Sequence, residues 1–587
     1  MEQAGLRSLT RQLAEDLGWL EEHARGRGGA GMHAAQLLFA GGLVRNVLGP
    51  WLENRPTAPL HIAVLGGAGA GKSTVANFLC GGPVAEANPQ AGFTRHPVAY
   101  VCAEAGSLAW GDYLGFLGPL KRLSAARGSD LDEDVYQVRR VGPESKDASL
   151  LRSAVVWDCP DMTTAASTGY QARLIEVAAL ADVIVFVASD ERYNDEIPTR
   201  FLDLFLRTGK TVIVCLVKVR EDDAAAFVDH FKKDVGKRLS APPAAIVTIP
   251  HLPFAQLRDP VEQAGAFRER LLAEVRRLSH GDARQRTVQA ALRYLKAHQG
   301  ELETVAREDL AALDGWRKTV QAGQAEFEER YRREFLTGER FRRFDEAYAR
   351  LVDLLEPPGL GKVAGTVLSL LRTPYRLVRG WFQRALTRPA AAAMPEKPVL
   401  EGAFSGWLDH LRKEAARRAA ENPLWTLVRE GFAGGLSDGA QERFDQGWRS
   451  LQLQQASETD AAARRVTERL ERQPVGLNII RAAKLALDAT AIILLLVNFG
   501  IGLVSIIGIP LAVSLTQHFS ELIAKAYVDH QRERVRNRQQ ELLRQLLSRP
   551  LAEWLSAWPV TGGSPYERLQ AALARIGPAL ADIEKAV

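Results

Sequence analysis

The sequence contains little cysteine. Only four of its 587 residues are cysteine, and none has the close paired spacing that a zinc site or a redox-active dithiol requires. We therefore expect Cys80, Cys102, Cys159 and Cys215 to be small buried residues in a reducing compartment. The N-terminal segment MEQAGLRSLT has no apolar run and predicts no secretory signal peptide.

The sequence also carries little net charge. Its 75 Lys and Arg residues against 70 Asp and Glu residues leave +5, which is too small to indicate a nucleic-acid-binding protein, and no nucleic acid is expected as a partner. The hydrophobic content of 46% and the charged content of 25% exclude a disordered protein and a membrane protein with many spans. At about 150 residues per domain, the length predicts three to four compact units.

The first 280 residues predict a helical segment followed by an α/β domain. Leucines recur at helical spacing through residues 5–25, and a second apolar-faced segment covers 33–52, so residues 1–57 are expected to be helical. From 58 to 280, short β-branched runs alternate with helical patterns, which is typical of a mostly parallel sheet. The expected strands cover 61–66, 97–103, 135–141, 153–159, 182–189, 211–217 and 244–250.

The remainder of the sequence is rich in Ala, Leu, Glu, Arg and Gln and predicts a largely α-helical bundle or stalk. Helical regions are expected over 281–388 and 401–484, and a Pro- and Ala-rich stretch predicts a linker over 389–400 between them. A hydrophobic segment covers 485–516, and further helices are expected over 517–587.

A phosphate-binding loop follows the first expected strand. A strand that runs into a glycine-rich loop and then into a helix lets backbone amides surround a β-phosphate at the helix N-terminus. Lys72 would bridge phosphates, and the Ser73 hydroxyl would bind Mg²⁺. The residues expected to contact the nucleotide are Gly66, Gly67, Ala68, Gly69, Ala70, Gly71, Lys72, Ser73 and Thr74. The sequence therefore predicts a nucleotide-binding P-loop.

Two further positions are candidates for the metal site. Asp158 ends the apolar strand 153–159 and is expected to hold a metal-bound water beside the P-loop, although a strand-capping role is the alternative. Thr94 lies in a polar loop before the strand 97–103 and would complete the Mg²⁺ shell as a switch residue, unless it is an ordinary loop threonine.

The order of these motifs, followed by a hydrophobic strand that ends in Lys218, resembles the translation-factor-like P-loop GTPases over residues 61–220. The arrangement of N-terminal helices, GTPase domain, long helices and a late apolar segment is similar to that of the dynamin-like group. This resemblance implies GTP as substrate or ligand, Mg²⁺ as cofactor and GTP hydrolysis. It implies that Lys72 and Ser73 bind the phosphates and Mg²⁺, and that Lys218 packs on the guanine. It also implies that Thr94 contacts the γ-phosphate and the metal, and that Asp158 binds the metal through water.

The sequence departs from that family pattern at three places. Asp161 stands where the family has a glycine whose amide senses the γ-phosphate. The guanine-reading motif ends in Arg220 instead of a carboxylate, so ATP is not excluded as the nucleotide, and Glu221, Asp222 or Asp223 are possible substitutes. Ala68 and Gly69 replace the polar pair that dynamins use in hydrolysis. Asp161, or a residue of a partner chain, is therefore a candidate to assist hydrolysis.

Two segments of the helical remainder indicate a membrane. Residues 489–515 carry no charge and have basic residues on both flanks, which favours a hairpin over a single span; a buried helical hairpin is the alternative. Residues 361–388 carry six basic residues and no acid, interleaved with aliphatic and aromatic ones. This pattern suits the headgroups of anionic lipid, and a basic surface helix is the alternative.

Together these features predict a membrane-associated dynamin-like GTPase that binds and hydrolyses GTP with Mg²⁺ and changes the conformation of a helical, membrane-attached stalk. It is expected on the cytoplasmic face of a membrane, inserted through about 485–516, with anionic lipid as a partner and a homodimer through the GTPase domain as a possibility. The resemblance to the dynamin-like group also implies that the N-terminal helices pack with C-terminal helices over 523–548 and 566–585. A nucleotide-binding membrane scaffold with little hydrolysis and a soluble P-loop ATPase are the alternative functions.

Overall fold

The computed structural model describes residues 3–27, 32–53, 59–85, 96–102, 117–118, 120–123, 135–142, 145–162, 167–189, 194–251, 265–280, 282–337, 396–472, 533, 536–561 and 564–587. The chain divides into two compact units, of which the first comprises Met1–Glu308 with Glu567–Val587 and the second comprises Asp309–Tyr566. The finer segment boundaries expected from the sequence stay predictions.

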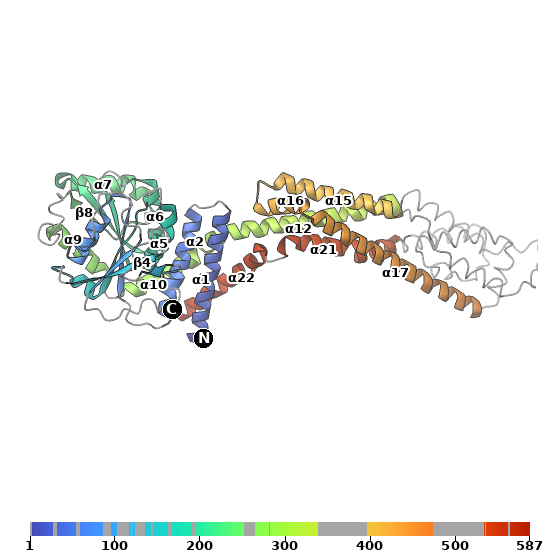
Figure 1. Ribbon diagram of the computed structural model, residues 1–587, viewed down its shortest axis with the longest axis horizontal. Coiled ribbons are helices and arrows are strands. Elements are labelled where there is room, and N and C mark those ends of the chain that lie inside the picture. The colour runs from blue at the N-terminus through green and yellow to red at the C-terminus, as the bar shows by residue number, and fades with distance from the viewer. Residues whose placement is uncertain are drawn as a thin grey trace, which may run out of the picture. The chain divides into compact units, whose positions relative to one another are not determined.

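A single sheet organises the first unit (Figure 1). Within the described residues it has eight strands in the order β3-β4-β2-β5-β1-β6-β7-β8. The strands are β1 Leu60–Gly66, β2 Val98–Cys102, β3 Lys121–Arg122, β4 Val135–Val141, β5 Ala154–Asp158, β6 Val183–Ser189, β7 Thr211–Val219 and β8 Ala245–Pro250. Only β2 and β5 pair antiparallel among the strand pairs that the structure describes. The expected α/β fold with a mostly parallel sheet is confirmed, and the two-residue strand β3 is an addition to the strands expected from the sequence.

The central strands are apolar because both faces of the sheet are covered. All seven residues of β6 are buried. Helices α4 (Lys72–Cys80) and α9 (Gly265–Leu278) pack on one face, where Val75, Phe78 and Leu272 join the same hydrophobic cluster as the strand residues Val64 and Val185. Helices α5 (Ser167–Leu180), α6 (Glu196–Arg207) and α7 (Ala224–Asp234) also belong to this unit. The four cysteines are free and buried, as expected.

Helices from both ends of the chain complete the first unit. Helices α1 (Gln3–Gly26), α2 (Met32–Leu43), α10 (Ala283–Ala297) and α11 (Gln299–Leu302) belong to it, together with most of α22 (Pro565–Ala586). Arg575 of α22 donates to both carboxylate oxygens of Asp16 in α1 over 2.6 and 2.9 Å. The Arg568 guanidinium lies 4.9 Å from the ring centroid of Trp19. The predicted packing of the 566–585 helix with the N-terminal helices is therefore confirmed.

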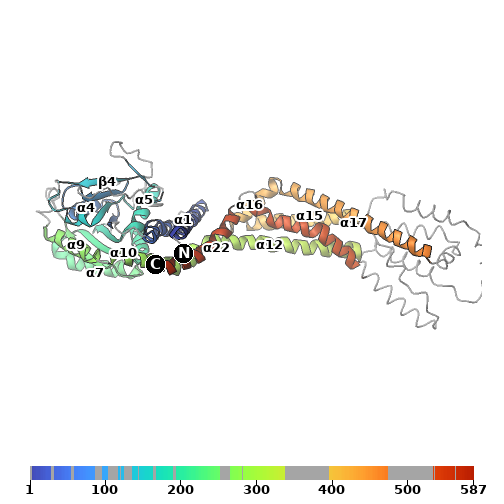
Figure 2. The same ribbon diagram turned by 90° about the horizontal axis from the view of Figure 1, so that it is seen from below.

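The second unit is a bundle of long helices (Figure 2). It comprises most of α12 (Thr304–Tyr331) together with α15 (Glu396–Arg418), α16 (Pro423–Ala433), α17 (Leu436–Arg472) and α21 (Arg549–Ala557). Its core is aromatic: the rings of Trp316 and Trp425 meet edge to face with centroids 6.2 Å apart, and Phe404 stacks on Phe444 at 4.5 Å. The Trp316 indole also donates to the Leu555 carbonyl over 2.9 Å. Residues 536–548 belong to this unit, so only one of the two predicted C-terminal helices lies in the same unit as the N-terminal helices.

Two π-helical turns each lead into a proline-containing helix. Val44–Leu48 precedes α3 (Gly49–Leu52), which contains Pro50, and Arg544–Ser548 precedes α21, which contains Pro550. Proline has no backbone N–H and its ring presses on the preceding turn, so a wider turn keeps the helix continuous. A third π-helical turn, Arg332–Leu336, follows α12.

Residues 396–400, which were expected to belong to a linker over 389–400, are helical, because α15 covers Glu396–Arg418. Pro398 does not prevent this, since proline is tolerated in the first turn of a helix. The hydrophobic segment 485–516 and the basic stretch 361–388 lie outside the described residues. Among the helices that the structure does describe, none combines the length and the apolar composition needed to cross a membrane.

Candidate nucleotide-binding site

The P-loop connects β1 to α4 at the centre of the sheet. Gly69 and Gly71 have φ angles of 66° and 92°, which are backbone conformations that side chains disfavour. At Gly66 an added Cβ atom would lie 2.2 Å from the Val187 carbonyl oxygen of β6. Glycine is therefore required at Gly66 by the close approach of the neighbouring strand, and at Gly69 and Gly71 by the course of the loop.

Lys72, the first residue of α4, turns its side chain back over the loop. Its Nζ donates to the Gly67 carbonyl over 2.9 Å and forms an ion pair with Asp161. Only 5% of the Lys72 side chain and 9% of the Asp161 side chain are exposed. Lys72, which was expected to bind phosphates, is thus held at the N-terminus of α4. Its contact with the Asp161 carboxylate was not predicted from the sequence.

Ser73 and Asp158 meet beside this lysine. The Ser73 hydroxyl donates to Asp158 Oδ2 over 2.8 Å. Burial raises the pKa of Asp158 to about 6, although the Ser73 hydrogen bond and the nearby Lys72 charge oppose this shift. Asp158 Oδ1 is also buried, and it has no hydrogen-bond partner among the described residues. A hydroxyl and a buried carboxylate with a free oxygen fit a hard, oxygen-seeking cation such as Mg²⁺.

The chain after Asp158 lies against the P-loop. The Met162 backbone N–H donates to the Gly66 carbonyl over 3.3 Å. Together with the Ser73–Asp158 and Lys72–Asp161 contacts, this bond fastens residues 158–162 to the loop at three points. Thr94, the third predicted metal ligand, lies outside the described residues.

Lys218, which was expected to pack on the base, lies near the end of β7. An added Cβ on Gly71 would lie 3.7 Å from the side chain of Val217, so the end of β7 adjoins the P-loop. Lys218 itself has a φ of 62°, at an irregularity in the pairing of β7 with β8. A lysine in this conformation is strained, and such strain occurs often at functional sites. The acidic residues offered as substitutes for the missing carboxylate form the 3₁₀ turn Glu221–Asp223 directly after Arg220.

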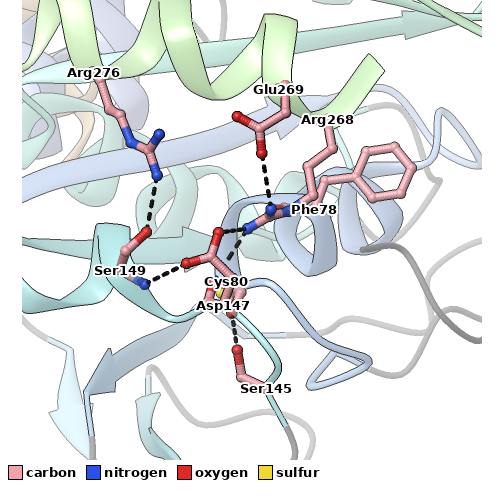
Figure 3. Close-up of polar contacts among 8 residues, drawn as sticks. All are labelled: Phe78, Cys80, Ser145, Asp147, Ser149, Arg268, Glu269 and Arg276. Carbon is pink, nitrogen blue, oxygen red and sulfur yellow. Dashed lines mark hydrogen bonds and ion pairs between the residues drawn. The ribbon is translucent and has the colours of Figure 1, made fainter. Parts of the chain in front are cut away.

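The opposite end of α4 is held by a buried arginine that the sequence analysis missed (Figure 3). Arg268 of α9, 2% exposed, donates Nε to the Phe78 carbonyl over 2.8 Å. Its Nη2 donates to the Asp147 carbonyl at 3.2 Å and to the Asp147 carboxylate at 2.8 Å. Hydrogen bonds from Ser149 and from Arg268 lower the pKa of Asp147 to about 2. A signal for this arginine was present, since it occupies an apolar position at helical spacing from Leu271, Leu272 and Val275.

Two other contacts close the same end of α4. The Ser145 hydroxyl donates to the Cys80 carbonyl over 2.6 Å (Figure 3). The Lys146 N–H donates to the Gly81 carbonyl over 3.0 Å. Gly81 follows α4 with a φ of 70°, and an added Cβ would lie only 1.9 Å from the Asp147 carbonyl oxygen. The carbonyl groups that a helix leaves unpaired at its C-terminus are thus satisfied by the segment 145–149 and by α9.

One region of the chain matches a known protein family. No curated protein matches the chain. Two solved structures, both described as an oligomerised bacterial dynamin pair that senses and tethers membranes, are similar at low identity. One is 12% identical over 74% of this chain and 80% of the other, with a TM-score of 0.28; the second is 10% identical over 99% and 82%, with a TM-score of 0.27. Residues 61–218 match the model of the 50S ribosome-binding GTPase family, so the α/β region that carries Lys72, Ser73 and Asp158 is a P-loop GTPase domain.

Proposed function

We propose that this chain is a membrane-associated, dynamin-like GTPase that binds GTP with Mg²⁺ and hydrolyses it. The observation that carries the proposal is the contact between Ser73 and Asp158 beside Lys72, at the N-terminus of α4. Lys72 and Ser73 belong to α4, which follows β1, and Asp158 ends β5, the parallel neighbour of β1. This arrangement suits a Mg²⁺–nucleotide complex.

Each residue has a defined role in this proposal. The loop amides from Gly66 to Thr74 and the Lys72 ammonium bind the phosphates, and Lys218 packs on the base. Ser73, Asp158 and Thr94 hold Mg²⁺, which when bound neutralises charge on the phosphate oxygens. A role of Asp161 or of a partner chain in hydrolysis stays a prediction.

The membrane part of the proposal rests on the sequence. The run 489–515 is uncharged and flanked by Arg481 and Lys484 on one side and by Lys525, Arg532, Arg534 and Arg536 on the other. The stretch 361–388 would add contacts with anionic headgroups. The helical second unit supplies a body that could change conformation with the nucleotide state.

Nucleotide binding is tested by titrating the full chain with a fluorescent GTP analogue and competing with GTP or ATP. Lys72→Ala should weaken binding by about ten- to a hundredfold, because it removes a charged hydrogen-bond donor to phosphate. Lys318→Ala is the matched control, since this lysine is 74% exposed and lies on α12 in the second unit. Equal competition by GTP and ATP would retract guanine selectivity while retaining the P-loop site.

Hydrolysis is tested by phosphate release with and without vesicles. Turnover at background level, unchanged by lipid, would contradict the enzyme hypothesis and support the alternative of a nucleotide-binding scaffold. The Ala68–Gly69 pair and Asp161 would then explain the lack of hydrolysis.

Membrane attachment is tested by flotation of the full chain with vesicles that contain anionic lipid. The double variant Leu495→Glu and Ile506→Glu should abolish flotation, because carboxylates in a spanning segment are costly. Leu453→Glu is the control, because Leu453 is 73% exposed on α17. Flotation that survives the double variant would contradict insertion through 485–516.

A further inference from the structure

Asp161 is paired with Lys72, the lysine that a bound phosphate has to contact. Its carboxylate forms an ion pair with Lys72, and both side chains are almost completely buried. An ammonium group has three N–H donors, of which Asp161 takes one and the Gly67 carbonyl takes a second. Two of the three N–H donors of Lys72 are therefore used by groups of the protein itself.

The position of Asp161 is fixed by its neighbours. Asp158, three residues earlier, accepts the hydrogen bond from Ser73, and Met162, the next residue, donates its N–H to Gly66. Because the chain is fastened to the P-loop on both sides of Asp161, its contact with Lys72 is a built feature of the site.

The charges of these groups oppose a phosphate. Among Lys72, Asp158 and Asp161 there are one cation and two carboxylates. A phosphate that binds Lys72 alongside Asp161 would be a second anion within a few ångströms of that carboxylate, in a site where burial strengthens like-charge repulsion.

We propose that Asp161 competes with phosphate for Lys72 and thereby sets the affinity of the site for nucleotides. Binding of a nucleoside triphosphate or diphosphate requires the Lys72–Asp161 ion pair to be given up, and Asp161 to leave the position beside the ammonium. This inference rests on the proposed nucleotide-binding function and adds to it the residue that limits how tightly the nucleotide is held.

Asp161→Asn tests this role, because asparagine has nearly the same shape without the charge. The affinities for GTP and for GDP, measured with Mg²⁺ by calorimetry, should rise by about ten- to a hundredfold. Asp161→Glu, which retains the charge, should bind about as weakly as the wild type. The melting temperature gives a second readout: without nucleotide it should fall in Asp161→Asn, because Lys72 loses its carboxylate, whereas the shift that GTP induces should grow.

Asp182→Asn is the matched control for the loss of a buried carboxylate. Asp182 lies at the other end of β1, where it accepts the His61 N–H at 2.9 Å and pairs with Arg284 at 2.8 Å, with none of its side chain exposed. This variant should lower the melting temperature without changing the nucleotide affinity.

The possible results distinguish a failure of the proposed Asp161 role from a failure of the proposed nucleotide binding. Equal or weaker binding by Asp161→Asn, with a wild type that binds, would overturn the inference and leave the nucleotide site standing. If neither the wild type nor Asp161→Asn binds a nucleotide, the proposed function fails and the inference fails with it. If Asp161→Asn does not fold, the comparison of Asp161→Glu with the wild type decides. Nucleotide binding as weak as that of the wild type supports the inference, and a higher affinity contradicts it.

Discussion

Ser73 and Asp158 are 85 residues apart in the sequence, and their side chains are in hydrogen-bond contact at 2.8 Å. The parallel pairing of β1 with β5 explains this, because Val64 is in register with Asp158 and the two strands end at the same edge of the sheet. The P-loop then brings Ser73 back over that edge as the second residue of α4. The two groups proposed to hold Mg²⁺ are therefore aligned by the sheet itself.

This contact predicts that nucleotide affinity depends on Mg²⁺ through both residues. Ser73→Ala and Asp158→Asn should each weaken GTP binding in Mg²⁺ by at least about tenfold, because each removes an oxygen that holds the metal or its water. With the metal removed by a chelator, Ser73→Ala should bind like the wild type. Titration with a fluorescent GTP analogue under both conditions checks this, and unchanged affinity of both variants in Mg²⁺ would refute the metal assignment.

The buried arginine at the far end of α4 predicts a large loss of stability on truncation. Arg268→Ala removes the donor to the Phe78 carbonyl and leaves the Asp147 carboxylate with Ser149 but without its charged partner, so it should lower the free energy of unfolding by about 3 kcal/mol or more. Arg276→Ala, on the same helix, removes one exposed hydrogen bond to Ser149 and should cost less than about 1 kcal/mol. Chemical denaturation of the two variants gives both values. Similar losses would show that the Arg268 contacts contribute little.

Two glycines predict opposite effects of the same substitution. Gly81→Ala should destabilise the first unit by at least about 2 kcal/mol, because of the left-handed backbone and the contact with the Asp147 carbonyl. Gly18→Ala, inside α1 and with nothing within 4 Å of the added Cβ, should stabilise it by up to about 1 kcal/mol. Melting temperatures that move in the same direction for both variants would contradict this reading of the two sites.

Glu396 predicts a pH dependence of the second unit. Burial raises the pKa of this carboxyl, which accepts from the Tyr331 hydroxyl at 2.6 Å and from Gln455 at 3.5 Å. A raised pKa means that the folded state holds the proton more tightly than the unfolded state does, so stability falls as the pH rises above the usual range of glutamate.

Glu396→Gln should therefore be more stable than the wild type at neutral pH, and the difference should shrink as the pH falls towards the ordinary glutamate pKa. Amide hydrogen exchange of α12 and α15 between pH 4 and pH 7 measures this in the full chain. A difference between the two proteins that does not vary with pH would exclude a role for ionisation.

The sequence predicts those parts of the fold that depend on apolar runs and local motifs. The seven expected strands are found within one or two residues of their predicted ends, because the strands of a covered sheet are continuous β-branched runs. Lys72, Ser73 and Asp158 lie close together in the structure, since a P-loop and a strand-ending carboxylate have a fixed relationship in a parallel sheet. The strand β3 was missed because two exposed basic residues form no apolar pattern.

Contacts that join distant segments through side-chain direction or backbone groups were not predictable in the same way. The pairing of Asp161 with Lys72 depends on the path of the chain after Pro160, which no periodicity encodes. Arg268 binds the backbone carbonyls of Phe78 and Asp147 as well as the Asp147 carboxylate, and a backbone group carries no sequence signal at all.

The first unit is discontinuous in the chain, since residues 567–587 rejoin Met1–Glu308 after the whole of the second unit. During synthesis, Asp16 and Trp19 of α1 can contact Arg575 and Arg568 only after the second unit has been translated, and the same holds for the contacts of the fully buried Ile583. The first unit can therefore complete its fold only after the ribosome has translated the second, and a chain truncated before α22 would present the uncovered face of α1 to chaperones and proteases.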